Sequence, residues 1–511
     1  MNNIKTLSFL LSLIWVHVSF GQNSTPNILM ITLDDMNWDS PYSNGGKITD
    51  LTPNIDSLAN SGVLFKNAYV QAPNCSPSRS VIQTGLYPHQ SGMRGFFYAT
   101  PNNNTLPEIL KNNGYFTGVL NKTADTSLSP DLDRYWDVSK NNKNSEKRSA
   151  DSYSKLLNNF LNQAKKVKKP FYCIVNIADP HKPFFNDPSS TKKGFKEFMP
   201  SKIYNLEDVT IPLFLPKDTK IKKEILNYIN SVKRGDDCVG EILKMLKKHK
   251  ISENTIVILL SDHGMPLPFA KSTVYQNGLK TPLIVSYKSK FIPSIERKSI
   301  VSAIDLAPTI LDMTQLEIPK EFEGQSFYPV LINEKEQVGK YVFGQFDENA
   351  GGTPRPSRTI LNGRYGYIFN PWATGMFTFK SASTYHATYK RMKKLSLSNK
   401  EVQKRFDFWK LRIVEEFYDY EKDPDALNNL IDDPAYKEKI DAFRNQLMLQ
   451  MKKTKDYVLV AFQNRDDKSY LNEWMKEQIS EAEIRMNTIK WKRLRNGKGS
   501  TKNNTNLFIN N

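Results

Sequence analysis

Acidic residues stand beside one another, or beside a histidine, at points where apolar runs of the chain end. Asp34 and Asp35 close the run NILMITLDD, Asp262 and His263 close NTIVILLSDH, and His181 follows FYCIVNIADP. Two adjacent carboxylates repel each other unless a cation lies between them. Asp34, Asp35 and Asp262 together would make an oxygen-rich pocket suited to Ca²⁺ or Mg²⁺. The spacing therefore favours a metal site over the alternative, a set of capping or salt-bridged acids.

Cys75 opens the stretch CSPSR, and its surroundings are polar and turn-like. Pro77 fits the first turn of a helix that begins here, and Arg79 lies four residues on, on the same helix face. Helix N-termini attract anions, so this stretch predicts a site that processes an anion. A bare cysteine nucleophile is the simplest interpretation, but a reactive thiol oxidises readily outside the cell. Cys173 and Cys238 lie in apolar or helical runs, where a buried, inert cysteine is expected.

The N-terminal residues have the pattern of an export signal. The largely apolar run LSFLLSLIWVHVSF is followed by the small and polar residues GQNSTPN, which predicts a signal peptide over residues 1–21 and a periplasmic or secreted protein. No later run is apolar enough to predict a transmembrane segment. The 511 residues carry a formal net charge of +18, which favours acidic partners such as polyanionic polysaccharides. No nucleic-acid-binding motif is recognised, so no nucleic acid is expected as a partner.

Strand-like and helix-like segments alternate over most of the chain, which predicts an α/β fold with a large, mostly parallel sheet covered on both faces. In such sheets ligands bind at the carboxyl ends of the strands, where Asp34, Lys122, His181 and Asp262 are expected. A pair of helices is predicted between residues 217 and 253. Short antiparallel strands and a long helix after about residue 340 predict a smaller C-terminal α+β subdomain. The expected domains are 22–340, 341–465 and a basic extension, 466–511.

The stretch from Cys75 to Arg79, followed by Thr84 and Gly85, resembles the C-x-P-x-R…T-G signature of type I sulfatases. The resemblance covers about residues 26–450. The segments CSPSRSVIQTGLYPHQSGM, DPHKP, SDHGMPLPFAKSTVY and LAPTILD are most similar to the sulfamidase-like branch, that of N-sulfoglucosamine sulfohydrolase. The resemblance to type I sulfatases implies an alkaline phosphatase-like sandwich fold and Ca²⁺ (or Mg²⁺) as cofactor. It also implies that a separate formylglycine-generating enzyme oxidises Cys75 to Cα-formylglycine.

The resemblance also implies a role for each matching residue. The implied metal ligands are Asp34, Asp35, Cys75 in its modified form, Asp262 and His263. Arg79 and Lys122 would hold the charge of the formylglycine and the sulfate, while His181 and Lys271 would contact sulfate and protonate the leaving oxygen. One hydroxyl of the hydrated aldehyde would attack sulfur and displace the alcohol; loss of the other hydroxyl's proton would then expel sulfate and restore the aldehyde.

The sequence also departs from the family's pattern. A histidine often found two residues after the lysine of the strand end is Ala124 here, and another that commonly precedes Asp179 is Ala178. Because both changes remove polar groups near sugar and sulfate, sulfamidase specificity does not carry over. Further substrate contacts are expected from exposed loops, and we predict a supporting position behind the site for His89. The candidate substrate-binding residues are Arg94, Asp347, Glu348, Arg355 and Arg358.

The sequence thus predicts an exported sulfatase acting on a sulfated carbohydrate, such as an oligosaccharide of algal ulvan. Three alternatives stay open. The first is an N-sulfoglucosamine sulfohydrolase, and the second is a phosphatase or phosphonate hydrolase of the same fold, against which the full signature weighs. The third is a non-catalytic binder of sulfated glycans, which would be expected to have lost a residue such as Cys75 or Lys122, and both are present.

Overall fold

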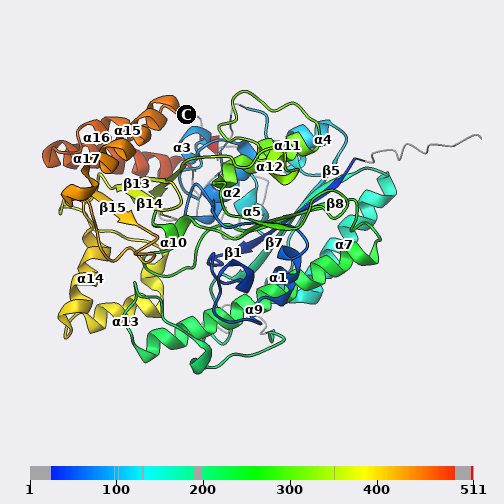
Figure 1. Ribbon diagram of the computed structural model, residues 1–511, viewed down its shortest axis with the longest axis horizontal. Helices are drawn as coiled ribbons and strands as arrows, with labels where there is room; N and C mark the ends of the chain where they lie inside the picture. The colour runs from blue at the N-terminus through cyan, green and yellow to red at the C-terminus, as the bar shows by residue number, and fades with distance from the viewer. Residues whose placement is uncertain are drawn as a thin grey trace, which may run out of the picture.

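The computed structural model describes residues 25–96, 98, 99, 101, 103–128, 132–188, 198–349, 352–489, 508 and 509. The predicted signal peptide, residues 1–21, lies outside these residues. Two units are visible: a large α/β unit and a smaller one built on an antiparallel sheet (Figure 1).

An eight-stranded sheet, in the order β10-β2-β9-β8-β1-β7-β5-β6, forms the centre of the large unit. All neighbouring strands are parallel except at β9, which is antiparallel to both β2 and β8. The strands are β1 (Asn27–Asp34), β2 (Val63–Phe65), β5 (Phe116–Leu120), β6 (Val138–Lys140), β7 (Phe171–Pro180), β8 (Thr255–Ser261), β9 (Leu283–Ser286) and β10 (Ser294–Glu296). The prediction of a large, mostly parallel sheet is confirmed.

Helices cover both faces of this sheet, which is why its central strands β1, β7 and β8 are almost wholly buried and read as near-continuous apolar runs. On one face lie α1 (Pro53–Ala59), α7 (Ala150–Val167) and α9 (Thr219–Lys248) (Figure 1). On the other lie α2 (Cys75–Thr84), α4 (Leu106–Asn112), α11 (Leu306–Met313) and α12 (Tyr328–Leu331). Shorter helices connect these layers: α3 (Pro88–Ser91), α5 (Thr123–Thr126), α6 (Leu132–Tyr135) and α10 (Gln276–Leu279).

The predicted pair of helices is wrong: α9 is one continuous helix. It begins at Thr219, and the carboxylate of the preceding N-cap residue, Asp218, accepts the N–H of Lys220 at 2.9 Å. Its two glycines do not interrupt it, because they serve close packing. A Cβ at Gly235 would lie 3.3 Å from Leu33 of β1, and one at Gly240 would lie 2.6 Å from the side chain of Asn54 in α1. The glycines therefore let α9 lie close against β1 and α1.

The smaller unit contains a four-stranded antiparallel sheet, ordered β12-β13-β14-β15. Its strands are β12 (Val342–Glu348), β13 (Pro354–Leu361), β14 (Tyr365–Phe369) and β15 (Glu415–Asp419). The helices α15 (Lys437–Lys453), α16 (Leu459–Gln463) and α17 (Lys468–Ile489) follow it in sequence, and α15 and α17 contact β13. The prediction of an α+β subdomain is confirmed. The expected basic extension from residue 466 opens with α17, in which Leu471, Trp474 and Met475 are buried.

A long insertion, residues 370–414, joins β14 to β15. It carries α13 (Ala387–Leu395) and α14 (Lys400–Leu411). Its two ends lie side by side, because Phe369 faces Glu415 in the sheet and the N–H of Asn370 donates to the carbonyl of Val414 at 2.7 Å. The insertion thus leaves and re-enters the sheet at one place.

Two short parallel strand pairs complete the described chain: β3 (Ala68–Tyr69) with β11 (Val301–Ser302), and β4 (Tyr98–Ala99) with β16 (Phe508–Ile509). Among the residues the structure describes, no helix is both long enough and apolar enough to cross a membrane.

Candidate active site at the carboxyl ends of the central strands

The carboxyl ends of β1 and β8 bring the predicted metal ligands together. These parallel strands are neighbours, so Asp34 and Asp35 at the end of β1 meet Asp262 and His263 just beyond β8. The backbone N–H of Asp35 donates to Oδ1 of Asp262 at 3.0 Å, and Nε2 of His263 lies 3.2 Å from Oδ1 of Asp35. Asp35 adopts a left-handed backbone conformation, with φ 71°, which few residues other than glycine favour. Such local strain is typical of functional sites.

Cys75 lies against this group of acids as the first residue of α2, in the helix layer that covers one face of the sheet. Its Sγ is 3.5 Å from Oδ1 of Asp34, 3.3 Å from Nε2 of His263 and 3.6 Å from Nζ of Lys271. Burial raises the pKa of the thiol well above its usual range. An unmodified Cys75 would therefore stay protonated, which argues against a plain thiolate nucleophile.

Arg79 is fully buried one turn further along α2 and fixes Asp262. Its Nη2 and Nε lie 2.8 and 3.1 Å from Oδ2 of Asp262. Its Nη1 donates to Oγ1 of Thr32 at 2.8 Å and also to Oδ1 of Asn176. These contacts fix the guanidinium against β1 and β7. It holds one oxygen of Asp262 and leaves the other, Oδ1, facing Asp35 and His263.

Two lysines balance the carboxylates of β1. Lys122, which follows β5 and has φ 46°, pairs with Asp34, while Nζ of Lys271 lies 2.6 Å from Oδ1 of Asp35. Burial disfavours the charged form of both lysines, but the facing carboxylates outweigh it and hold the pKa of each above its usual range. Burial raises the pKa of the Asp35 carboxyl. At Asp34 burial acts in the same direction, but the charge of Lys122 outweighs it and holds the pKa of that carboxyl well below 3.8. Both lysines are therefore ammonium ions at neutral pH.

His181 approaches the same acids from the end of β7. Its Nδ1 lies 2.6 Å from the carbonyl of Lys182, so that nitrogen carries the proton, and Nε2 points toward Oδ2 of Asp35 at 4.0 Å. Burial holds the pKa of the imidazole well below 6.5 despite the nearby Asp34 carboxylate. Arg148 and Arg234 hold this loop: both pair with the buried Asp179, and Nη2 of Arg148 donates to the carbonyl of His181 at 2.7 Å.

The side chains gathered here fit a hard divalent cation. One ligand atom from each of Asp34, Cys75, Asp262 and His263 lies within 4.8 Å of every other, and Asp34, Asp35 and His181 form a second such group. Oδ2 of Asp35 is buried and has no hydrogen-bond partner among the described residues, so this carboxylate oxygen is free to bind a cation. An oxygen-rich set suits Ca²⁺ or Mg²⁺, with one nitrogen contributed by His263. We call these residues, with Lys122 and Lys271, the strand-end cluster.

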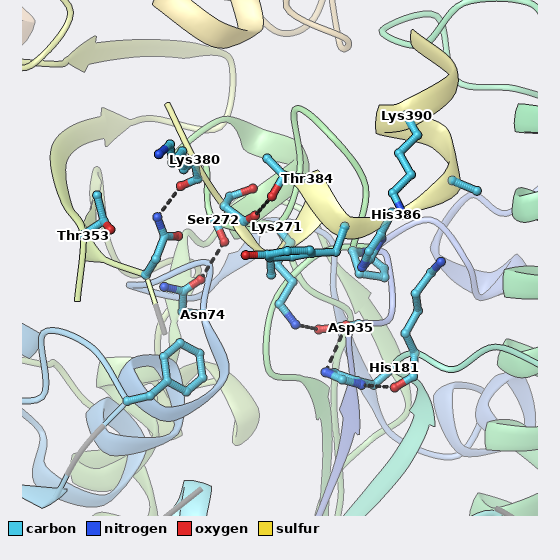
Figure 2. A pocket seen from close by; sticks show the side chains of 18 of the residues that line it. Asp35, Asn74, His181, Lys271, Ser272, Thr353, Lys380, Thr384, His386 and Lys390 are labelled. Atoms are coloured by element: carbon cyan, nitrogen blue, oxygen red, sulfur yellow. Dashed lines mark hydrogen bonds and ion pairs between the residues drawn. The ribbon is translucent and has the colours of Figure 1, made fainter. Parts of the chain in front are cut away.

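Three members of the strand-end cluster line the floor of a cavity of about 660 Å³. Figure 2 shows Asp35, His181 and Lys271 at the floor, with Lys380, Thr384, His386 and Lys390 above them. The upper wall is therefore contributed by the insertion between β14 and β15, and the floor by the large unit. Sequence reasoning missed His386 and Lys390, because no motif marks them and only the folded insertion brings them to the cavity.

The predicted substrate contacts lie elsewhere and are not among the residues that line this cavity. Arg358 is buried and holds two carboxylates, those of Asp347 at 2.9 Å and Asp456 at 2.5 Å. Glu348 pairs with Arg485 of α17, and the guanidinium of Arg94 stacks 4.7 Å above the ring of Tyr457. Nε of Arg355 donates to the carbonyl of Thr378 at 2.8 Å. The structure thus corrects their placement: they looked exposed in sequence, but Asp347, Glu348, Arg355 and Arg358 are buried and Arg94 is half-buried.

His89 belongs to the same set of contacts. Its Nδ1 lies 2.7 Å from Oε1 of Gln345, whose amide donates to Oδ2 of Asp347 at 2.5 Å, and Tyr457 donates to Oδ1 of Asp347 at 2.7 Å. His89 therefore joins the large unit to the smaller one and does not support the strand-end cluster. We call this set the interdomain cluster: His89, Gln345, Asp347, Arg358, Asp456 and Tyr457.

Comparison with known proteins agrees with this geometry. The family model described as Sulfatase matches residues 26–316, and the model described as N-sulphoglucosamine sulphohydrolase, C-terminal, matches residues 262–372. An ulvan-active sulfatase of Formosa agariphila is 26% identical over 83% of this chain and 74% of its own length. The human N-sulphoglucosamine sulphohydrolase is 26% identical over 82% of this chain and 89% of its own.

Solved structures share the fold. A protein in complex with its substrate D-glucosamine-2-N,6-O-disulfate superposes with a TM-score of 0.62 at 20% identity, covering 85% of this chain and 99% of its own. Because the sulfatase model spans more than half of the chain, and because the residues of its signature converge on one buried cluster, the protein belongs to the sulfatase family and is a sulfuric ester hydrolase.

Proposed function

We propose that the protein hydrolyses sulfate esters of a sulfated carbohydrate outside the cytoplasm, through a formylglycine formed from Cys75 and a bound Ca²⁺ or Mg²⁺. The observation that carries the proposal is the position of Sγ of Cys75. It lies within 3.6 Å of Asp34, His263 and Lys271, between the proposed metal ligands and a charged lysine. A nucleophile at this position would have a cation beside it, and Lys271, which contacts it, lines the cavity.

The chain's own side chains supply most of the required chemistry. When bound, the metal would act as a Lewis acid held by Asp34, Asp35, Asp262 and His263, and the hydrated aldehyde would supply the nucleophilic hydroxyl. Lys122 places positive charge beside residue 75, where it would stabilise the anionic transition state.

Proton transfer is assigned to two different groups. A sugar alkoxide is a poor leaving group, so a general acid is required. Lys271 is charged and in contact with Cys75, so we propose that it donates the proton to the leaving oxygen. His181 is neutral with Nε2 unprotonated, so that atom is suited to accept a proton when the second hydroxyl is deprotonated.

Sulfated saccharides are proposed as the substrate class for two reasons. The chain is basic, and its relatives include an ulvan-active sulfatase and an N-sulphoglucosamine sulphohydrolase. The second candidate function is hydrolysis of an N-sulfated glucosamine, which the match of residues 262–372 to the C-terminal sulphohydrolase model favours. Against it stand Ala124 and Ala178, where histidines are common in the family.

The test is sulfate release by protein produced together with a formylglycine-generating enzyme. The panel contains ulvan and carrageenan oligosaccharides, heparan fragments with N-sulfoglucosamine, an aryl sulfate and an aryl phosphate. Release from an O-sulfated sugar that is lost in Cys75→Ala and kept in the matched control Cys173→Ala supports the proposal. Release only from the N-sulfated sugar favours the second candidate. No release by protein whose residue 75 is converted, as judged by mass, contradicts both.

A further inference from the structure

The cavity above the strand-end cluster has an uncompensated positive wall, and the inference drawn from it rests on the proposed function. Both acids that line the cavity are already paired: Asp35 with Lys271 at 2.6 Å and Asp187 with Lys182 at 3.7 Å. Lys380 and Lys390 also line the cavity, and neither forms an ion pair with any described residue. The upper wall therefore presents two positive charges that the described residues leave without an anion.

His386 gives the second, independent observation. Only 8% of this residue is exposed, it lines the cavity, and its Nδ1 has no hydrogen-bond partner in the described part of the chain. Burial, with the charges of Lys182 and Lys271 nearby, holds the pKa of its imidazole well below 6.5, so the ring is neutral. Leaving a buried polar atom unsatisfied is unfavourable, and a ligand in the cavity would satisfy Nδ1.

His386 and Lys390 are held in a fixed relation to each other. His386 is the N-cap residue of α13 and Lys390 lies four residues on in that helix, and both line the cavity. Figure 2 shows both at the same side of the cavity, above Asp35 and His181. The helix start is fixed by Glu224 of α9, whose carboxylate accepts the N–H groups of Ala387 at 3.1 Å and Thr388 at 2.5 Å. The pair is therefore positioned before any ligand binds.

We propose that Lys390 and His386 form a subsite for a second anionic group of the same saccharide whose sulfate ester lies over residue 75. The substrate class is then a sugar carrying at least two anionic groups, the second a sulfate or a carboxylate. Lys390 supplies the charge. The neutral ring of His386 donates to the carbonyl of Pro266, so its unpartnered Nδ1 accepts a hydrogen bond from a hydroxyl beside this group. A singly charged saccharide would leave Lys390 unpaired and would bind more weakly.

The test measures binding, so that it does not depend on turnover. Cys75→Ala protein with Ca²⁺ is titrated by calorimetry with disaccharides that share one sulfate ester and differ in a second group: hydroxyl, sulfate or carboxylate. We expect the doubly anionic ligands to bind at least about tenfold more tightly, as one charge-assisted contact allows. Comparing the sulfate with the carboxylate identifies the preferred anion.

Lys390→Met in the same background should remove most of this preference, while Lys390→Arg keeps it. Lys393→Met is the matched control, because Lys393 is an exposed lysine of the same helix that does not line the cavity. His386→Leu should weaken binding of the doubly anionic ligands, and His386→Asn should restore part of it. The proposal is overturned if the second anion brings no preference, if no doubly anionic ligand binds, or if Lys393→Met loses as much as Lys390→Met. The proposed function is tested separately: it fails if the formylglycine-bearing protein releases no sulfate.

Discussion

The strand-end cluster and the interdomain cluster, both buried groups of charged residues, differ in how completely their carboxylates are hydrogen-bonded. The strand-end cluster and the interdomain cluster both pair carboxylates with cations and exclude water. In the interdomain cluster every carboxylate oxygen is satisfied: Arg358 and Tyr457 bind Oδ1 of Asp347, Gln345 binds its Oδ2, and Arg358 binds both oxygens of Asp456. In the strand-end cluster Oδ2 of Asp35 has no hydrogen-bond partner among the described residues, and the group faces a cavity. Burial and charge are thus common to both clusters, whereas an unsatisfied carboxylate oxygen at the floor of a large cavity distinguishes the strand-end cluster.

The sharpest test of this difference is Asp35→Asn. Removing one negative charge from the proposed metal site should lower kcat by about a thousandfold or more, because Lewis-acid stabilisation is worth several kcal/mol. Addition of Ca²⁺ should raise the melting temperature of the parent protein and not that of the variant. Asp456→Asn is the control from the interdomain cluster, and it should keep the calcium response. An Asp35→Asn protein that Ca²⁺ still stabilises would place the metal elsewhere.

Arg358→Met should show the opposite pattern. It leaves the carboxylates of Asp347 and Asp456 buried without their cation, which should lower the free energy of unfolding by about 3–5 kcal/mol. The protein that remains folded should keep its kcat, since Arg358 does not line the cavity. Urea unfolding measures the first effect and sulfate release the second. Arg364→Met, which removes a more exposed arginine paired with Asp419, should destabilise far less.

Acid should weaken the interdomain cluster. Burial opposes ionisation of Asp456, but Arg358 outweighs it and lowers the pKa to about 2 from 3.8. Because the folded pKa lies below the unfolded one, the ion pair stabilises the protein above pH 4, and this contribution is lost as the pH falls toward 2. The loss is about 2 kcal/mol. The unfolding free energy of Asp456→Asn should therefore fall less steeply than that of the parent below pH 4, and parallel curves would contradict the assignment.

Arg94→Gln should have the smallest effect. The guanidinium stacks on Tyr457, a contact worth about 0.5–1 kcal/mol, so stability should fall by no more than that. KM and kcat for a sulfated saccharide should stay within about twofold if Arg94 is structural, as its position indicates. A tenfold rise in KM, with stability unchanged, would restore Arg94 to the substrate site and blur the distinction between the two clusters.

Sequence patterns predicted the strand-end cluster well, for a physical reason. Strands buried on both faces must be apolar, so polar residues at their ends stand out, and parallel strands bring those ends to one edge. Asp34, Asp262 and the lysine after β5 were therefore visible without a structure. The continuous α9 was not predicted: a pair of helices was expected over residues that form one helix, in which Gly235 and Gly240 allow close packing.

The partners of Arg358 and the cavity wall at His386 could not be predicted from local sequence. Arg358 and Asp456 are about a hundred residues apart, and nothing near either marks the pairing. An arginine in a stretch of glycine and proline looks exposed, but Arg358 lies in β13 and is buried against Asp347 and Asp456. His386 lies in an insertion whose place above the sheet depends on contacts with Glu224, far away in sequence. Long-range pairing of this kind follows from tertiary packing alone.

Residues 370–414 are joined at both ends to the neighbouring strands β14 and β15. This attachment suggests how such enzymes diverge after gene duplication. Because both ends of this insertion meet at the β14–β15 edge, a descendant could exchange the whole segment for another without moving the sheet that holds it. Such an exchange would replace the wall that carries His386 and Lys390 and leave residue 75 and its neighbours untouched. Inherited chemistry and acquired preference would then occupy separate stretches of the gene, so that selection could act on one without disturbing the other.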